Sequence, residues 1–233
     1  GGSVVTRARA RDRPGGADYP VARVLARCRG IPFRHAEMAD GEWNQPFDPE
    51  ALPPDLRTAT VGIVGFGNIG RGVARRLAGF DAELLAHDPY VDDDAIADTG
   101  AEPVDKAELF ERADAVTLHV RLTDETEGLI GGDELRLRGG DGVLVNVARG
   151  EVCDQDALVG ALRSHLIRGA ALDVFEEEPL PTDSRLWDLS NVIVTPHMAG
   201  STPHEAERWT EIIAENYRRL VANDPDAMRN RVV

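Results

Sequence analysis

A glycine-rich string lies directly after a short apolar run in the first third of the chain. Gly65, Gly67 and Gly70 are spaced Gly-x-Gly-x-x-Gly, and the apolar spacing from Ile69 onwards predicts that a helix begins there. In such a strand–loop–helix unit the first glycine allows a tight turn, the second lets a pyrophosphate approach the backbone, and the third lets helix and strand pack closely. The free N–H groups at the helix start would face the phosphates. The string therefore predicts a dinucleotide-binding loop.

An acidic residue follows at the distance that this kind of loop requires. Asp88 ends the next apolar run, 21 residues beyond Gly67. Its carboxylate can accept hydrogen bonds from both ribose hydroxyls, and its charge would repel a 2′-phosphate. The combination therefore favours NAD over NADP. The plainer alternative is a glycine turn followed by a surface aspartate, which the complete context of strand, loop, helix and acid disfavours.

Three more polar residues lie where predicted strands end, which is where ligands bind in such sheets. Arg149 follows the run 143–146, and its guanidinium could bind a carboxylate through two parallel hydrogen bonds. His197 follows the run 192–194, where a histidine could donate or accept a proton near neutral pH. Glu178 lies in an acidic run and by itself indicates nothing. Considered alone, each could be an ordinary surface, capping or interface residue.

These residues need a scaffold that brings strand ends together, and the sequence predicts one. Short apolar runs, typical of strands buried on both faces, alternate with amphipathic stretches at helical spacing. This alternation predicts an α/β fold, a doubly wound parallel sheet of the Rossmann type. After the last strand, Thr202 to Glu205 could form a capping box that begins a long helix. The expected strands are 60–64, 84–86, 115–120, 143–146, 170–172 and 192–194.

The composition excludes several classes of protein. The 233 residues carry 41 Asp and Glu against 26 Lys and Arg, a formal net charge of −15, which disfavours binding to nucleic acid or to an anionic membrane surface. No apolar run reaches the roughly 20 residues of a membrane span. Cys28 and Cys153 lie far apart and predict neither a disulfide framework nor a metal site. A reducing, cytoplasmic setting is therefore favoured.

Taken together, these segments resemble the D-isomer-specific 2-hydroxyacid dehydrogenases. The likeness extends from about Val4 to the C-terminus and lies in the order and spacing of five segments, namely 65–70, 118–120, 146–150, 172–179 and 195–197. It implies an NAD-dependent oxidoreductase that transfers a hydride between NAD(H) and a D-2-hydroxy acid/2-oxo acid pair.

The resemblance also implies roles for individual residues. Arg149 would orient the carboxylate and carbonyl of the substrate. His197 would be the acid/base, and Glu178 would be the carboxylate paired with it, which favours the charged imidazolium. Asp173 would contact the nicotinamide end of the cofactor. The implied cofactor-binding residues are Gly65, Gly67, Asn68, Ile69, Gly70, Asp88, Val147, Ala148, Arg149, Asp173, His197 and Gly200.

The sequence departs from the family pattern in several places, and two of these departures bear on function. Arg121 stands where the family usually has a proline beside the cofactor, so an extra cation there could alter cofactor affinity or choice. Most of the family's substrate-binding domain is absent before Val4. We therefore expect residues 1–16 to be a remnant of that domain, 17–201 to be the dinucleotide-binding domain, and 202–233 to be a helix and tail that return to the substrate domain.

Other functions stay open at this point. A non-catalytic NAD(H)-sensing regulatory or corepressor-like protein of the same fold would fit the absent domain and Arg121, but it has no chemical need for an intact arginine, glutamate and histidine set. A homocysteine-nucleoside hydrolase would use the same loop, yet the single lysine, Lys106, does not lie at a strand end. The sequence does not specify which 2-hydroxy acid is used. By resemblance we also expect a homodimer, with 33–43 as a candidate contact.

Overall fold

The computed structural model of the chain describes residues 14–46, 52–53 and 55–229, and within them it shows one sheet of seven parallel strands. The strand order is β3-β2-β1-β4-β5-β6-β7, so the chain runs from the middle to one edge and then from the middle to the other. The order reverses between β1 and β4, which is the topology of a doubly wound sheet. The strands are β1 (Thr60–Val64), β2 (Glu83–His87), β3 (Glu102–Pro103), β4 (Ala115–Leu118), β5 (Val143–Asn146), β6 (Gly169–Leu172) and β7 (Val192–Val194).

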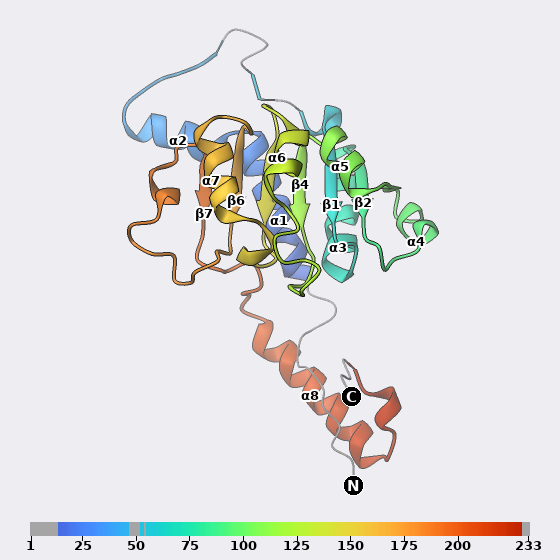
Figure 1. The fold of residues 1–233 in the computed structure, drawn as a ribbon. Helices are drawn as coiled ribbons and strands as arrows, with labels where there is room; N and C mark the ends of the chain where they lie inside the picture. Colours follow the sequence, from blue (N-terminus) through green and yellow to red (C-terminus); the bar gives the residue numbers. More distant parts are fainter. Residues whose placement is uncertain (1–13, 47–51, 54, 230–233) are drawn as a thin grey trace.

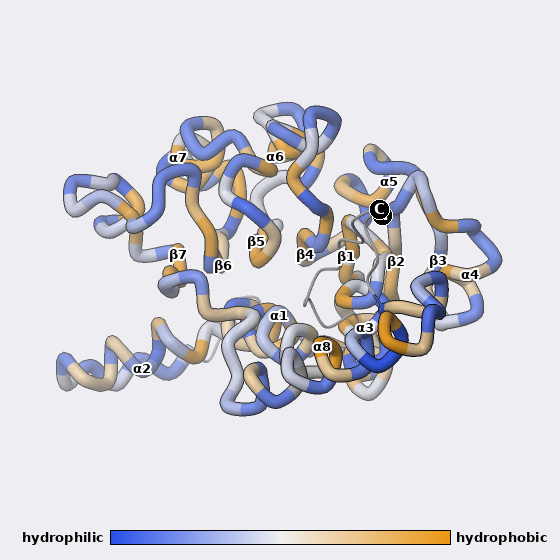
Figure 2. The backbone as a smooth tube through the Cα atoms, turned by 90° about the horizontal axis from the view of Figure 1, so that it is seen from below, coloured by the Kyte–Doolittle hydropathy of each residue, from blue (hydrophilic) through white to orange (hydrophobic). Residues whose placement is uncertain are grey.

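Helices cover both faces of this sheet (Figure 2). On one face α1 (Pro14–Cys28) packs against α3 (Asn68–Leu77). On the other, α5 (Lys106–Arg112), α6 (Gly132–Arg138) and α7 (Gln155–Arg163) lie side by side. The strands between the two layers are buried along almost their whole length, as expected for a parallel sheet with two covered faces. The expected α/β, doubly wound fold of the Rossmann type is confirmed.

Shorter elements complete the fold. α2 (Ile31–Ala39) follows α1, and α4 (Asp93–Ala97) contacts β3 at the edge of the sheet. The expected domain remnant at 1–16 lies mostly outside the described residues, and residues 14–16 are the start of α1. Short 3₁₀ helices occur at Leu56–Thr58, Ala78–Phe80, Gly150–Val152, Arg185–Asp188 and Pro225–Ala227.

The last helix, α8 (Glu205–Val221), follows β7 and extends away from the sheet (Figure 1). Its apolar stripe is mostly uncovered, because Trp209, Ile213 and Leu220 are exposed while Ile212 is buried. A helix of this length with an exposed apolar stripe is amphipathic but not packed against the described core.

The sequence-based expectations differ from the structure at three places. The strand expected at 115–120 ends at Leu118, because the chain turns there to pass the glycine-rich loop. The two-residue strand β3 was not predicted, since two residues show no periodicity. The expected capping box is wrong: α8 has His204 as its N-cap and no side-chain cap.

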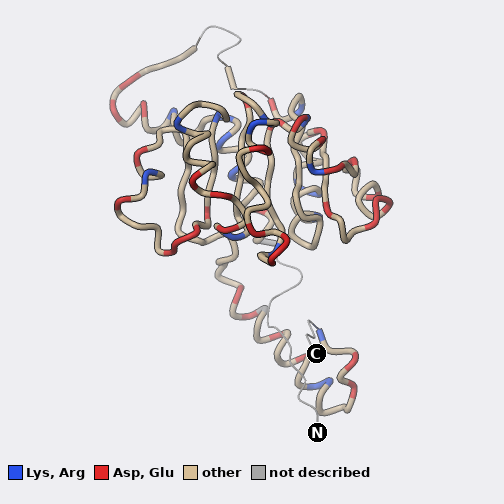
Figure 3. Tube along the Cα trace, viewed as in Figure 1, with Lys and Arg blue, Asp and Glu red and all other residues tan. Residues whose placement is uncertain are grey.

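Acidic residues outnumber basic residues in the chain, and Figure 3 shows both kinds spread over its helices and loops. Every helix among the described residues is too short or too polar to serve as a membrane span.

Candidate functional site

The glycine-rich loop begins where β1 ends and lies against the segment after β4. Gly65 has φ of +91°, and its N–H donates a hydrogen bond to the carbonyl of His87 across 2.9 Å. A Cβ added at Gly65 would lie 2.7 Å from the carbonyl carbon of His119. The backbone conformation and the close approach therefore both require glycine at this position.

The other two glycines leave room for a ligand at the start of α3. A Cβ on Gly70 would lie 2.2 Å from the carbonyl oxygen of Gly65, so only glycine lets α3 begin this close to β1. In front of Gly67, by contrast, an added Cβ would meet no atom within 4 Å. No described side chain caps α3 at this end. Free N–H groups facing open space fit the pyrophosphate of a dinucleotide.

Asp88 lies at the end of β2, directly beside this loop. One carboxylate oxygen accepts a hydrogen bond from the Phe66 N–H across 2.7 Å, and the other accepts one from the Tyr90 N–H across 3.0 Å. A carboxylate has about four acceptor positions, so the half-buried group retains capacity for hydroxyl donors. The acid is thus adjacent to the loop, as the spacing predicts, and it also holds the loop in place.

Arg149 lies in a turn after β5 that a buried amide stabilises. The side chain of Asn146 accepts a hydrogen bond from the Ala148 N–H across 3.0 Å and donates one to the Arg149 carbonyl across 2.9 Å. The half-buried guanidinium donates from Nη1 to the Ala148 carbonyl across 2.5 Å. No other described residue bonds to it, so its remaining N–H groups can bind a carboxylate. The amide clamp was missed, although an asparagine directly at a strand end is a signal for one.

Gly150 brings this turn into contact with the loop after β6. A Cβ at Gly150 would lie 1.9 Å from the carbonyl carbon of Phe175, so the two backbones touch. Because β5 and β6 are parallel neighbours, their carboxyl ends lie at the same edge of the sheet. The loop after β6 carries Asp173 and Glu178, and it therefore lies next to the turn of Arg149.

His197 and Glu178 form a direct pair at this edge. The Nδ1 atom of His197 lies 2.7 Å from Oε2 of Glu178. The other oxygen, Oε1, accepts a hydrogen bond from the Phe175 N–H across 3.0 Å, which fixes the carboxylate. Both side chains are partly exposed, at 46% and 35%, so a substrate can reach them. The arrangement orients the imidazole and leaves Nε2 for proton transfer.

Asp173, in contrast, is fully buried beneath the segment that carries His197. Its Oδ2 accepts a hydrogen bond from the Ala199 N–H across 2.6 Å, and its backbone carbonyl accepts one from the His197 N–H across 2.8 Å. Its Oδ1 accepts a short hydrogen bond from the hydroxyl of Thr195 and lies 3.3 Å from Nη2 of Arg23. Sequence analysis assigned no role to Thr195, although it lies in the segment 195–197, and Arg23 belongs to no local motif.

The remaining residues of the implied cofactor set surround these groups. Asn68 and Ile69 are exposed at the start of α3, Val147 is half-buried, Ala148 is buried, and Gly200 is half-buried in the segment after β7. Their contacts with a cofactor stay predictions.

Two further residues lie where β4 ends. Burial lowers the pKa of His119 to about 3, and its Nε2 lies 3.0 Å from the hydroxyl of Thr117, so the ring is neutral and fits a structural role. Arg121 is exposed, and no described residue pairs with its guanidinium.

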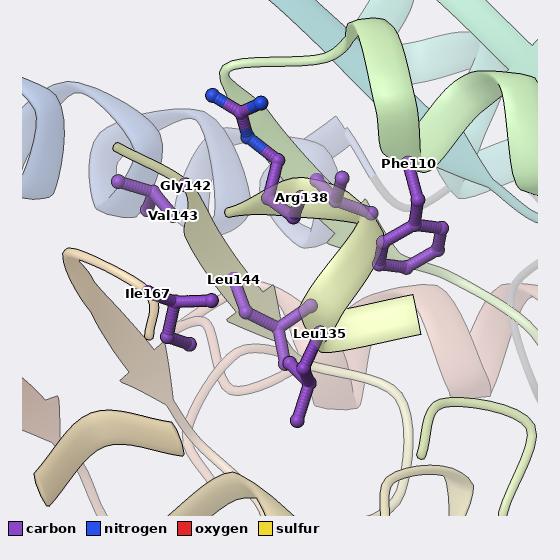
Figure 4. Close-up of a pocket in the computed structure, with 8 residues that line it drawn as sticks. Phe110, Leu135, Arg138, Gly142, Val143, Leu144 and Ile167 are labelled. Carbon is purple, nitrogen blue, oxygen red and sulfur yellow. The ribbon is translucent and has the colours of Figure 1, made fainter. Parts of the chain in front are cut away.

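Two cavities among the described residues lie away from this edge. One, of about 10 Å³, is enclosed mainly by Phe110, Leu135 and Leu144 between α5, α6 and β5 (Figure 4). It is apolar and too small for a substrate. The other is an open groove beside α8 that contains Arg218, Arg219 and Arg229. The candidate site is instead a surface at the carboxyl ends of the strands, where ligands bind in open parallel sheets.

The fold and the site together define a Rossmann-type dinucleotide-binding domain, with an imidazole–carboxylate pair at the carboxyl ends of its strands. The family model described as "D-isomer specific 2-hydroxyacid dehydrogenase, NAD binding domain" matches residues 21–199. The chain belongs to this family.

Named relatives and solved structures support the same assignment. A glyoxylate reductase of Korarchaeum cryptofilum is 40% identical over 201 residues, which cover 86% of this chain and 60% of the relative. A D-lactate dehydrogenase of Aquifex aeolicus, solved with NAD and lactic acid, superposes with a TM-score of 0.86 at 30% identity, covering 99% of this chain and 73% of that one. A D-isomer-specific 2-hydroxyacid dehydrogenase of Xanthobacter autotrophicus, solved with NADPH and MES, superposes at 0.84 with 30% identity, covering 100% and 93%. The chain thus spans about 60% of the length of the glyoxylate reductase.

Proposed function

We propose that the chain is the cofactor-binding part of an NAD-dependent D-2-hydroxyacid dehydrogenase, which interconverts a D-2-hydroxy acid and its 2-oxo acid. The observation that carries this proposal is the 2.7 Å contact between Nδ1 of His197 and Oε2 of Glu178, which lie in the segments that follow β7 and β6. A protein that only binds a dinucleotide needs the loop and Asp88, but it has no use for an oriented imidazole–carboxylate pair.

The reaction assigns a separate task to each side chain. Bound NAD(H) supplies or accepts the hydride at C2 of the substrate. Arg149 would bind the substrate carboxylate and hold the carbonyl in place, because a guanidinium offers parallel N–H donors. In the reductive direction His197 would give a proton to the carbonyl oxygen, and in the oxidative direction it would take the proton from the hydroxyl. Glu178 would keep the imidazole ring oriented in both directions of the reaction.

We propose further that NAD is preferred to NADP. Asp88 supports this choice because its negative charge lies beside the loop, where it would repel a 2′-phosphate. The relative from Xanthobacter autotrophicus was solved with NADPH, so the family fold alone does not decide between the two cofactors.

The experiment is NADH oxidation by the purified chain with a panel of 2-oxo acids, compared with Arg149→Ala. Turnover that falls sharply in the variant while NADH binding persists would support the dehydrogenase. Equal turnover in the variant would contradict the role of Arg149. Binding of NADH without oxidation of any 2-oxo acid, together with an NADH-dependent protein partner, would instead favour a sensing function.

We also propose that the protein is a cytoplasmic homodimer. Support comes from α2 and the residues after it, where Ile31, Met38 and Trp43 are exposed at 60%, 49% and 77%. Such an apolar surface is typical of an interface. The two cysteines are free and buried, which suits a reducing compartment. Sedimentation as a monomer at micromolar concentration would contradict the dimer.

The division into domains is likewise a proposal. We infer that 17–201 forms the cofactor domain and that α8, with the rest of 202–233, contacts the substrate-binding domain of the family. The exposed stripe of Trp209, Ile213 and Leu220 supports this contact, since it lacks a partner among the described residues. Protection of α8 from proteolysis in a chain that includes an upstream substrate domain would test it.

A further inference from the structure

A buried cation lies on α1 where the helix faces the sheet. Arg23 is only 5% exposed, and its guanidinium carbon stands 4.8 Å from the centre of the Tyr19 ring. Its Nε and Nη1 atoms are buried and have no hydrogen-bond partner among the described residues. Burial lowers the pKa of Arg23, while Tyr19 and Asp173 act in the opposite direction. Burying a charge with two unmade hydrogen bonds costs stability. An arginine kept at such a position therefore calls for a functional reason, and the group that it pairs with indicates one.

The partner is the carboxylate of Asp173. Nη2 of Arg23 lies 3.3 Å from Oδ1 of Asp173, whose side chain has no exposed surface. The same oxygen accepts a hydrogen bond from Thr195, which in turn accepts one from the Tyr19 hydroxyl across 2.9 Å. Within the described part of the chain, Arg23 provides the only cation that pairs with this carboxylate. Without it, a full negative charge would be buried among neutral donors.

This pair lies directly under the candidate site. The carboxylate of Asp173 accepts a hydrogen bond from the Ala199 N–H, and its backbone carbonyl accepts one from the His197 N–H. Asp173 therefore supports the segment that carries the proposed acid/base. Under the proposed function, Asp173 is also the residue beside the nicotinamide ring. That ring carries a positive charge in NAD⁺ and none in NADH. An unmatched carboxylate next to it would therefore favour the oxidised cofactor.

We infer that Arg23 is a positioning residue that offsets the buried charge of Asp173 and thereby sets the relative affinity of the site for oxidised and reduced cofactor. The inference rests on the proposed function, because it needs NAD to bind with its nicotinamide near Asp173. With the pair intact, the net charge behind the ring is zero, and NADH loses no affinity relative to NAD⁺. A merely structural Arg23 would fill space in the core, and an apolar side chain would replace it without changing this ratio.

The experiment measures the dissociation constants of NAD⁺ and NADH for the full chain at one fixed pH. In Arg23→Met the affinity for NAD⁺ relative to NADH should rise about fivefold, and in Asp173→Asn, which leaves the cation unmatched, it should fall by about as much. Arg23→Lys, the matched control that keeps the charge, should stay near the wild-type ratio. In the double variant Arg23→Met/Asp173→Asn, the affinity for NAD⁺ relative to NADH should return towards the wild-type ratio.

The outcomes separate this inference from the proposed function. A wild-type chain that binds neither cofactor would overturn the proposed function, and this inference with it. Cofactor binding with an unchanged ratio in folded Arg23→Met would overturn the inference alone. If Arg23→Met does not fold, as judged by circular dichroism, the decision passes to Asp173→Asn. An unchanged or increased relative affinity for NAD⁺ in that variant contradicts the charge argument.

Discussion

Glu178 and His197, 19 residues apart in the sequence, meet through Oε2 and Nδ1 at 2.7 Å. The contact joins the loop after β6 to the segment after β7. His197 has φ of +49°, and the Phe175 N–H holds the second oxygen of Glu178. The Phe175 N–H thus fixes the carboxylate that the imidazole contacts. Under the proposed function, an imidazole that a carboxylate already orients would need less reorganisation during proton transfer.

The first prediction concerns this pair. Glu178→Gln should lower kcat for 2-oxo acid reduction on the order of ten- to a hundredfold, because an amide cannot stabilise the charged imidazolium. His197→Asn should lower it further, on the order of a hundredfold or more. NADH affinity, measured by fluorescence titration, should change little in either variant. Glu177→Gln, at a neighbouring exposed acid, serves as the control and should keep wild-type turnover. A normal kcat in Glu178→Gln would remove Glu178 from the mechanism.

The second prediction concerns the third glycine of the loop. Gly70→Ala places a Cβ 2.2 Å from the Gly65 carbonyl, so α3 must move away from β1. We expect a loss of unfolding free energy of about 1–3 kcal/mol in urea denaturation, together with weaker NADH binding. Gly79→Ala is the matched control, because a Cβ there meets no atom within 4 Å. Equal stability and NADH affinity in the two variants would show that the close approach does not exist.

The third prediction concerns cofactor choice. Asp88→Asn keeps an acceptor for the Phe66 N–H but removes the charge, so the affinity for NADPH relative to NADH should rise on the order of tenfold. Asp93→Asn, at an exposed acid in the first turn of α4, should leave the ratio unchanged. Both ratios can be measured by competition against bound NADH. If the two variants behave alike, repulsion by Asp88 is not the basis of the preference.

The fourth prediction concerns stability in acid. Burial lowers the pKa of His119 to about 3, against 6.5 for an unperturbed imidazole. Between these values the unfolded chain binds a proton at this site that the folded chain does not, so stability falls as the pH falls. His119→Gln removes the titrating group. The difference in unfolding free energy between variant and wild type should therefore shift in favour of the variant by about 3 kcal/mol from neutral pH to pH ~4. Parallel stability curves would mean that His119 is not held neutral by burial.

The part of the site that sequence alone could predict is the part with local signals. The loop from Gly65 to Gly70 needs three glycines within six residues, and the helix after it shows its own apolar spacing. Arg149 and His197 follow apolar runs, so their places at strand ends could be deduced without a structure. These signals suffice because each depends on backbone geometry within one short segment.

The burial of two arginines of α1 could not be predicted from the sequence pattern. Arg23 and Arg27 lie beside the apolar stripe of Val21 and Val24, and a charged residue at such a position is expected to face water. Both are instead buried, and burial lowers the pKa of Arg27 to about 10. The partner of Arg23 is 150 residues away, so no spacing along the chain could indicate it.

The sequence by itself therefore determined the alternation of strands and helices, the dinucleotide loop with Asp88, and the identity of the polar residues at the strand ends. The family resemblance implied the pairing of Glu178 with His197, and the structure gives its geometry. Tertiary structure alone decided that Asn146 clamps the turn of Arg149 and that Arg23 pairs with Asp173. The physical reason is that loops and turns are set by local backbone sterics. The pairing of buried charges, in contrast, depends on which distant segments the closed sheet brings within hydrogen-bond distance.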